Sequence, residues 1–335
     1  GRASSVIDVF GKKGNQEEIK GKFNIGILNS GALLQGPIND RIRFIVGART
    51  SYYNLLSSLD NPDPSLDESF KYSIYDINGK LTWQPNQNHK VSLSVFSGGD
   101  KQTYFYNEPS NGVNLTENSG LKIKTTGVSL LHRGSLTKKL SIENLVAYSD
   151  YQNGLYLNTT NEIDNLSTSE NINSISDIKD LTIKSRLDFY QSNSYTMRLG
   201  LEASYYNFNP GIQNNTIENE QGEEIINETV GFIDKLESFE ASIYQENEID
   251  LSSSFRLNLG VRAVNYKAKD VSYFKVEPRL SARWLLNENL SLKGNFTIVN
   301  QFNHVLVNNI DGFEREIWFS STKDLAPEKA IWLMY

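Results

Sequence analysis

Apolar and polar residues alternate with a period of two along thirteen stretches of this sequence, separated by gaps that are alternately short and long. Residues two apart share a face of a β-strand, so each stretch predicts a strand with one apolar and one polar face. Short turns at one end and long segments at the other are typical of an up-and-down transmembrane β-barrel. A soluble sandwich would mix its loop lengths at both ends. The short gaps are 38–40, 84–90, 134–139, 191–194, 250–254 and 286–289, and the long ones are 53–69, 100–120, 153–174, 208–235 and 303–326.

The stretch 255–263 shows the two predicted faces most clearly. Its odd positions are Phe, Leu, Leu, Val and Ala, and its even positions are Arg, Asn, Gly and Arg. A soluble sandwich turns its polar face to bulk water, where Lys and Glu dominate, whereas a barrel lumen accepts Arg, Asn, Ser, Thr and Gly. The polar faces of this chain favour the second set, and small residues at mid-strand suit curvature and close approach. The pattern therefore favours an all-β, antiparallel membrane barrel over a sandwich.

Aromatic residues gather at the ends of the predicted strands. Trp83, Phe189 and Trp284 end an apolar face just before a short turn, while Tyr195 and Phe255 begin one just after it. Such clusters, with aliphatic residues between them, are typical of the two interfaces of a membrane barrel. Tyrosines predicted at the end with the long segments are Tyr52, Tyr53, Tyr72, Tyr104, Tyr148, Tyr151, Tyr205, Tyr266 and Tyr273.

The composition excludes several classes of protein. Only 38% of the 335 residues are apolar, which is low for a soluble core of this size but fits a barrel with a polar lumen. No apolar run approaches the 18 residues of a membrane helix, and no linker divides the chain. There is no cysteine, so the chain has no disulfide or thiol chemistry. The net charge is −7, with acidic residues concentrated in 216–237, which argues against nucleic acid as a partner.

No constellation of catalytic or metal-binding residues is apparent. His89, His132 and His304 lie far apart in the sequence without carboxylates or cysteines at ligand spacing, so we expect solvated histidines rather than a metal site. A calcium loop from Asp60, Asp63, Asp67 and Glu68 lacks the EF-hand spacing and is interrupted by prolines. There is no nucleophile elbow, P-loop or dinucleotide fingerprint. The sequence therefore predicts neither an enzyme nor a bound cofactor.

Three segments together resemble the TonB-dependent outer-membrane receptors. Gly1–Val9, followed by Gly14-Asn15, resembles the last strand of their plug domain and its exit to the barrel. Leu34–Ile38 and Phe44–Tyr52 look like their second and third barrel strands. Glu277–Ser281, Leu290–Gln301 and 318–327 are similar to a mid-barrel stretch of the Bacteroidetes-type members.

The resemblance implies a 22-stranded barrel filled by an N-terminal plug, which takes up scarce nutrients with energy from the inner-membrane TonB complex. In that frame residues 1–15 are the end of the plug and its exit linker, and 16–335 are an incomplete barrel. Residues 19–302 supply about thirteen strands, and a fourteenth begins near Glu328. We expect an internal fragment of a longer, exported protein of the outer membrane of a Gram-negative, Bacteroidetes-like bacterium.

The same resemblance implies partners and a candidate site. The partners are membrane lipid, the TonB complex (through a missing N-terminal region), an extracellular siderophore, vitamin, oligosaccharide or peptide, and, for a glycan or peptide ligand, a surface lipoprotein. A passive, porin-like or structural barrel is the alternative, and a secreted adhesin or glycan-binding sandwich or solenoid would not need the interface aromatics. The charged residues expected to face the lumen, and there to hold the plug or line the ligand path, are Arg49, Asp76, Lys80, Arg198, Glu202, Arg262, Arg279 and Arg283.

Overall fold

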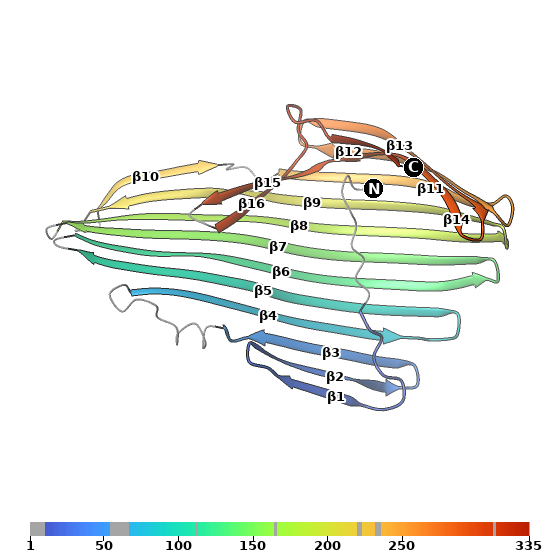
Figure 1. Ribbon diagram of the computed structural model, residues 1–335, viewed down its shortest axis with the longest axis horizontal. Helices are drawn as coiled ribbons and strands as arrows, with labels where there is room; N and C mark the ends of the chain where they lie inside the picture. The colour runs from blue at the N-terminus through green and yellow to red at the C-terminus, as the bar shows by residue number, and fades with distance from the viewer. Residues whose placement is uncertain are drawn as a thin grey trace.

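Antiparallel β-strands make up nearly all of the computed structural model, which describes residues 11–53, 67–110, 113–163, 166–219, 223–231, 236–310 and 313–334 (Figure 1). No helix among these residues is long and apolar enough to cross a membrane. The strands are β1 (Lys20–Ile25), β2 (Asn29–Asn39), β3 (Ile42–Ser51), β4 (Asp67–Trp83), β5 (His89–Ser110), β6 (Val113–Thr137), β7 (Leu140–Ile163), β8 (Leu166–Ser192), β9 (Tyr195–Glu218), β10 (Glu224–Gly231), β11 (Leu236–Asp250), β12 (Phe255–Ala268), β13 (Val271–Asn287), β14 (Leu290–Gln301), β15 (Asn303–Ile310), β16 (Phe313–Ser320) and β17 (Glu328–Met334).

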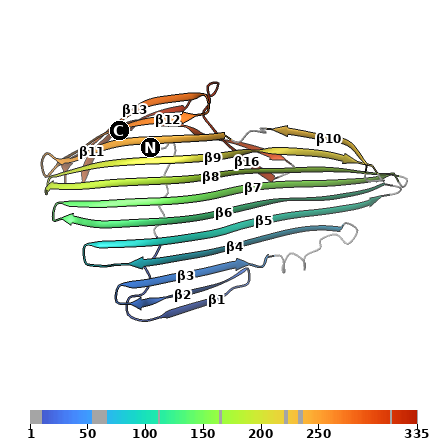
Figure 2. The ribbon, with the colours of Figure 1, turned by 180° about the vertical axis from the view of Figure 1, so that it is seen from behind.

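One sheet of 15 strands contains all of these elements except the separate hairpin β15–β16. Strand β10 pairs only with β9, and the other strands follow the order of the chain from β1 to β14 and then β17 (Figures 1 and 2). This up-and-down, antiparallel order confirms the predicted fold class, and β17 begins at Glu328, where the sequence predicts a further strand. Within the described residues β1 and β17 are the two ends of the sheet and do not pair, so the barrel is open.

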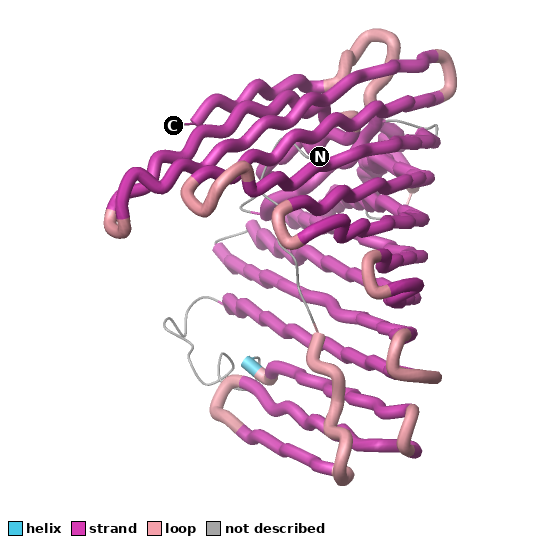
Figure 3. The backbone as a smooth tube through the Cα atoms, turned by 90° about the vertical axis from the view of Figure 1, so that its right-hand side faces the viewer, coloured by secondary structure: helices cyan, strands magenta, loops and turns pink. Residues whose placement is uncertain are grey.

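The sheet is strongly twisted. Figure 3 shows that the strands near the C-terminus slope in the opposite direction to the strands at the other end of the sheet. Each strand is rotated slightly relative to its neighbour, and this right-handed twist accumulates over many strands. A long twisted sheet of this kind curls into a trough with two distinct faces.

The outer face carries exposed apolar side chains in continuous rows, and we define it as the face with Val95 and Leu130. One row of the strand register, from β5 to β11, consists of Val95, Val128, Tyr148, Leu181, Tyr205 and Phe239. The neighbouring row toward the short turns consists of Leu93, Leu130, Val146, Ile183, Ala203 and Ala241. Two residues beyond the first row, toward the long hairpins, the face becomes polar with Ser97, Thr126, Asp150, Lys179, Asn207 and Glu237.

This apolar belt has the character of a lipid-facing surface. Its large side chains are exposed in the protein, which water would penalise and a bilayer would not. Trp83 and Trp284 lie exposed beside the short turns, and Trp284 is the register partner of Phe255 on the next strand. The belt is thus flanked by aromatic side chains at the end where the short turns lie.

The long polar segments are mostly strands rather than the loops that the sequence predicts. Strands β5 to β9 contain between 22 and 27 residues each, whereas about 9–11 residues cross a bilayer. They therefore continue well past the apolar belt as paired hairpins. Their tips are rich in hydroxyl and amide side chains, which hydrogen-bond across strands: the Thr116 hydroxyl donates to Asn107 Oδ1 over 3.0 Å. Polar β-formers of this kind pair when a neighbouring strand satisfies the backbone.

Two predictions from the sequence lie outside the described residues. These are the plug-like strand Gly1–Val9 and the part of the calcium-loop pattern that contains Asp60 and Asp63. The segment 303–326, expected to be a loop, contains the hairpin β15–β16 and leads into β17.

Candidate functional site

The hairpin β15–β16 lies against one face of the sheet, which we call the inner face. Strand β16 contacts β7, β8, β9 and β11, and the Tyr151 hydroxyl of β7 donates a 3.0 Å hydrogen bond to Glu316 Oε2 (Figure 1). Tyr151 and the outer-face residue Tyr148 are three residues apart on β7, so their side chains lie on opposite faces of the sheet. The hairpin therefore covers the face opposite to the apolar belt. The strand registers place all eight predicted lumen residues on this inner face: Arg49, Asp76, Lys80, Arg198, Glu202, Arg262, Arg279 and Arg283.

A continuous network of ion pairs crosses the inner face near the short turns. Arg198 of β9 lies at its centre: its Nε is 3.5 Å from Asp188 of β8, and its Nη2 is 3.2 Å from Glu248 of β11. Arg279 of β13 lies 3.8 Å from Glu246, which also approaches Arg198. The network joins strands β6 to β9 and β11 to β13, and its members are Arg133, Glu143, Arg186, Asp188, Arg198, Glu246, Glu248, Asp250, Arg256 and Arg279.

These charges balance one another within the sheet. Each arginine of the network has at least one carboxylate within 4.0 Å. Arg198 and Arg279 therefore have partners without a plug, which the period-two pattern alone could not reveal. A contact of these side chains with a plug or a ligand stays a prediction.

A second ion-pair cluster, with Arg262 and Glu277 buried, lies further along β12. Arg262 is 6% exposed and donates from Nη1 to Glu277 Oε2 over 3.1 Å and from Nη2 to Glu240 Oε1 over 2.8 Å. Glu277 is fully buried, and its Oε1 accepts hydrogen bonds from the backbone N and the side-chain amide of Asn300 over 2.7 and 3.2 Å. A buried carboxylate is tolerated only with such a complete set of donors.

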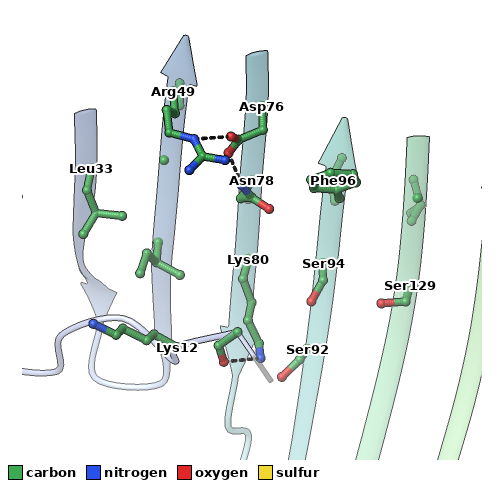
Figure 4. A pocket seen from close by; sticks show the side chains of 18 of the residues that line it. Lys12, Leu33, Arg49, Asp76, Asn78, Lys80, Ser92, Ser94, Phe96 and Ser129 are labelled. Atoms are coloured by element: carbon green, nitrogen blue, oxygen red, sulfur yellow. Dashed lines mark hydrogen bonds and ion pairs between the residues drawn. The ribbon is translucent and has the colours of Figure 1, made fainter. Parts of the chain in front are cut away.

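A cleft of about 960 Å³ opens on the inner face over β1 to β7. Figure 4 shows Arg49 and Asp76 on its wall, joined by an ion pair of 2.7 Å, with the Asn78 amide donating to the other oxygen of Asp76 over 2.8 Å. Lys80 Nζ donates a 3.2 Å hydrogen bond to the carbonyl of Gly11. The segment that begins at Gly11 therefore runs along the inner face before it enters β1.

The charge in this cleft is predominantly positive. Its lining contains Lys12, Lys22 and Lys80, together with the Arg49–Asp76 pair and Arg133, which pairs with Glu143, and the other lining residues are uncharged. The cleft can accept an acidic group, either of a ligand or of another part of the protein.

The remaining predicted residues lie outside this cleft. Glu202 pairs with Lys184 over 3.0 Å, and Arg283 is exposed without an ion pair within the described part of the chain.

The hairpin β15–β16 is anchored at its base by buried polar contacts. His304 Nε2 lies 2.8 Å from the Ser321 hydroxyl, and its Nδ1 lies 3.1 Å from Glu328 Oε1. The Tyr266 hydroxyl donates to the Ser321 carbonyl over 3.0 Å, and its ring stacks on Phe302. The expectation of a solvated His304 is therefore wrong: the chain reversal after Phe302 brings it onto the sheet.

His89 and His132 also meet, although 43 residues separate them in the sequence. Their rings stack, with His89 Nδ1 at 3.0 Å from His132 Nε2 on adjacent strands. Strand pairing decides this proximity, and a spacing rule along the sequence cannot detect it. No group of three or more His, Cys, Asp or Glu residues that could hold a metal ion occurs in the described ranges.

Arg315 of β16 is a candidate that the sequence analysis missed. It is 6% exposed, its Nε makes no hydrogen bond, and it forms no ion pair with another described residue. Burial lowers the pKa of its guanidinium, which nevertheless stays charged at neutral pH. The sequence predicts a loop at 303–326. The only signal for Arg315 there is that apolar and polar residues alternate over 313–320, where the arginine lies.

Comparison with known proteins decides the family. Residues 51–330 match the family described as "TonB dependent receptor-like, beta-barrel". The chain belongs to this family. TonB-dependent receptors are outer-membrane proteins of Gram-negative bacteria, and they are transport receptors rather than enzymes. The match confirms the family that the sequence resembles and the predicted outer-membrane location. It also confirms the prediction that the chain is not an enzyme. No curated protein sequence matches the chain.

Solved structures of TonB-dependent receptors share this fold. The ferripyoverdine receptor of Pseudomonas aeruginosa is 12% identical with a TM-score of 0.61, over 87% of this chain and 43% of the receptor. The siderophore receptor PirA of Acinetobacter baumannii is 17% identical with a TM-score of 0.53, over 95% and 47%. The RagAB peptide importer is 10% identical with a TM-score of 0.55, over 90% and 41%. The chain thus spans less than half the length of these proteins.

Proposed function

We propose that this chain forms part of the barrel of a TonB-dependent receptor that takes up a scarce nutrient with energy from the inner-membrane TonB complex. The observation that carries the proposal is the difference between the two faces of the sheet. The inner face carries a network of ion pairs, and the outer face carries an exposed apolar belt. Charged groups on such a wall suit a lumen that is filled by a polar body and crossed by a polar ligand. The eight predicted residues would line this lumen, with Arg49, Asp76 and Lys80 in the open cleft.

The division of the chain is part of this proposal. Residues 1–15 would be the end of a plug domain and its linker, and 16–335 part of a barrel with further strands. The hydrogen bond from Lys80 to Gly11 supports this division, because it guides the incoming segment along the inner face. The edges of β1 and β17 would then pair with the remaining strands, since an open edge is costly in a membrane.

The nutrient would enter from the side of the long hairpins. Solved structures of the same fold include a ferripyoverdine receptor and a peptide importer, and we propose a siderophore, vitamin, oligosaccharide or peptide as the nutrient of this chain. A surface lipoprotein would assist if the ligand is a peptide or an oligosaccharide. Arg315, a buried residue of the inward hairpin itself, would meet an anionic group of the ligand when the hairpin moves.

An uptake assay tests this function. Cells that express the complete receptor would receive radiolabelled ferric siderophores, cobalamin, oligosaccharides and peptides in separate assays. We expect uptake of one ligand class, lost both without the receptor and without TonB, because the energy for release comes from the inner membrane. Uptake that persists without TonB and in the presence of a protonophore would instead support a passive, porin-like barrel.

A further inference from the structure

Three lysines lie together on the outer face, on the long-hairpin side of the apolar belt. Lys101 of β5 and Lys122 of β6 are direct partners in the strand register, and Lys124 is two residues further along β6 on the same face. All three are exposed. The register between β5 and β6 is continuous from Val95–Val128 to this pair, so the lysines share the face of the apolar belt.

The positive charge of this group is not neutralised within the described part of the protein. Like charges directly opposite one another on a sheet are destabilising, so a Lys–Lys register pair is unfavourable without an anion. None of the three lysines has a carboxylate within 4.0 Å among the described residues, and the carboxylates that follow on the neighbouring strands of this face are Asp150 and Asp177. Asp150 lies 4.0 Å from Lys179, and Asp177 accepts a 2.9 Å hydrogen bond from Asn209.

The position of the lysines relative to the membrane identifies the anion. The last apolar row contains Val95 and Val128, and the three lysines follow four to six residues later. That spacing is roughly 13–20 Å along the strands, and less along the membrane normal because such strands tilt by about 40°. Each lysine carries its amine on a flexible four-carbon stem, so the amines can reach back toward the headgroup layer above the hydrocarbon.

We propose that Lys101, Lys122 and Lys124 form a binding site for the phosphate of a lipid headgroup in the leaflet on the side of the long hairpins. Several lysines around one phosphate act as point charges without requiring a preformed pocket. A bound phosphate would remove the repulsion within the Lys101–Lys122 pair. The lipid would also cover the neighbouring apolar row, which a free phosphate ion cannot do. The site therefore selects a phosphate that is carried by a lipid.

Lipid retention by the complete receptor tests this proposal. The receptor would be placed in phosphatidylcholine nanodiscs with a small amount of lipid A or of dephosphorylated lipid A, and native mass spectrometry would measure the fraction that carries each lipid. The test variant replaces Lys101, Lys122 and Lys124 with glutamine. The matched control replaces the inner-face lysines Lys90, Lys275 and Lys293 with glutamine, so that the same charge is removed from the opposite face.

We expect wild type and control to retain phosphorylated lipid A equally, and the outer-face variant to lose at least about tenfold in affinity, because each lysine near an anionic surface contributes about fivefold. Dephosphorylated lipid should bind weakly to all three, and excess inorganic phosphate should displace little lipid. Equal retention by the outer-face variant, equal binding of the dephosphorylated lipid, or complete displacement by inorganic phosphate would each overturn the proposal. If the triple variant does not fold, Lys122→Gln alone removes the repulsive pair and carries the same test.

Discussion

Replacing Arg262 with methionine is expected to destabilise the complete barrel by about 3–5 kcal/mol, because it leaves a buried carboxylate without its counter-ion. Glu277 is fully buried, and Arg262 is the only cation within ion-pair distance of it in the described residues. The two hydrogen bonds from Asn300 would remain, but they do not neutralise the charge. Methionine keeps much of the volume of the arginine stem, so the loss would report the charge rather than a cavity.

The control for this measurement is Arg49→Met. Arg49 also pairs with a carboxylate, at 2.7 Å, but its side chain is 62% exposed. Exposed pairs contribute about 0–1 kcal/mol, so the control should lose no more than that. Folding free energies of both variants in lipid vesicles, from denaturant titrations, give the comparison. Similar losses for the two variants would show that the Arg262 cluster is not the buried structural centre that its geometry indicates.

Placing an arginine on the outer face of β12 is expected to cost about 2–4 kcal/mol in a bilayer, whereas the same change on its inner face should cost much less. Leu259 is exposed and the strand register places it on the outer face, whereas its neighbour Asn258 lies on the inner face, the face of Arg279. Leu259→Arg therefore brings a charge into hydrocarbon, and Asn258→Arg brings it among carboxylates and water. A slip of one residue in the strand register would exchange the two faces.

Folding free energies of the two arginine variants in vesicles measure this difference directly. A larger penalty at Asn258, or equal penalties at both positions, would contradict the assignment of the two faces. Repeating the pair of measurements in detergent gives an internal check, because the penalty at Leu259 depends on hydrocarbon around the barrel and should shrink when water reaches the site.

The sequence predicts the strands and their faces well, because period-two alternation is a local signal that each strand carries for itself. It also predicts the short turns and the start of β17 near Glu328. It fails at 100–120 and 153–174, where polar composition suggests loops although the chain forms paired strands. Above the membrane both faces meet water, so the apolar signal disappears while the pairing continues.

The candidate site is only partly readable from the sequence. Alternation places Arg198 and Arg279 on the polar face, but their partners Asp188 and Glu246 come from other strands, whose register the sequence does not specify. The inward fold of β15–β16, and with it the burial of Arg315, depends on contacts around Ser321 between distant segments. Such long-range contacts have no periodic signature along the chain.

The most direct test of the two-faced barrel uses the absence of native cysteine in the chain. Single cysteines would be introduced one at a time along β6, from Lys122 to Leu131, and labelled with a nitroxide in the complete receptor in lipid vesicles. Collision rates with oxygen, which concentrates in hydrocarbon, and with a water-soluble nickel complex would then be compared at each position. We expect oxygen to dominate at Val128 and Leu130, nickel to dominate at Ser129, and nickel to dominate again at Lys122 and Lys124. A profile without this alternation, or with oxygen favoured at Ser129, would contradict a membrane barrel with the faces assigned here.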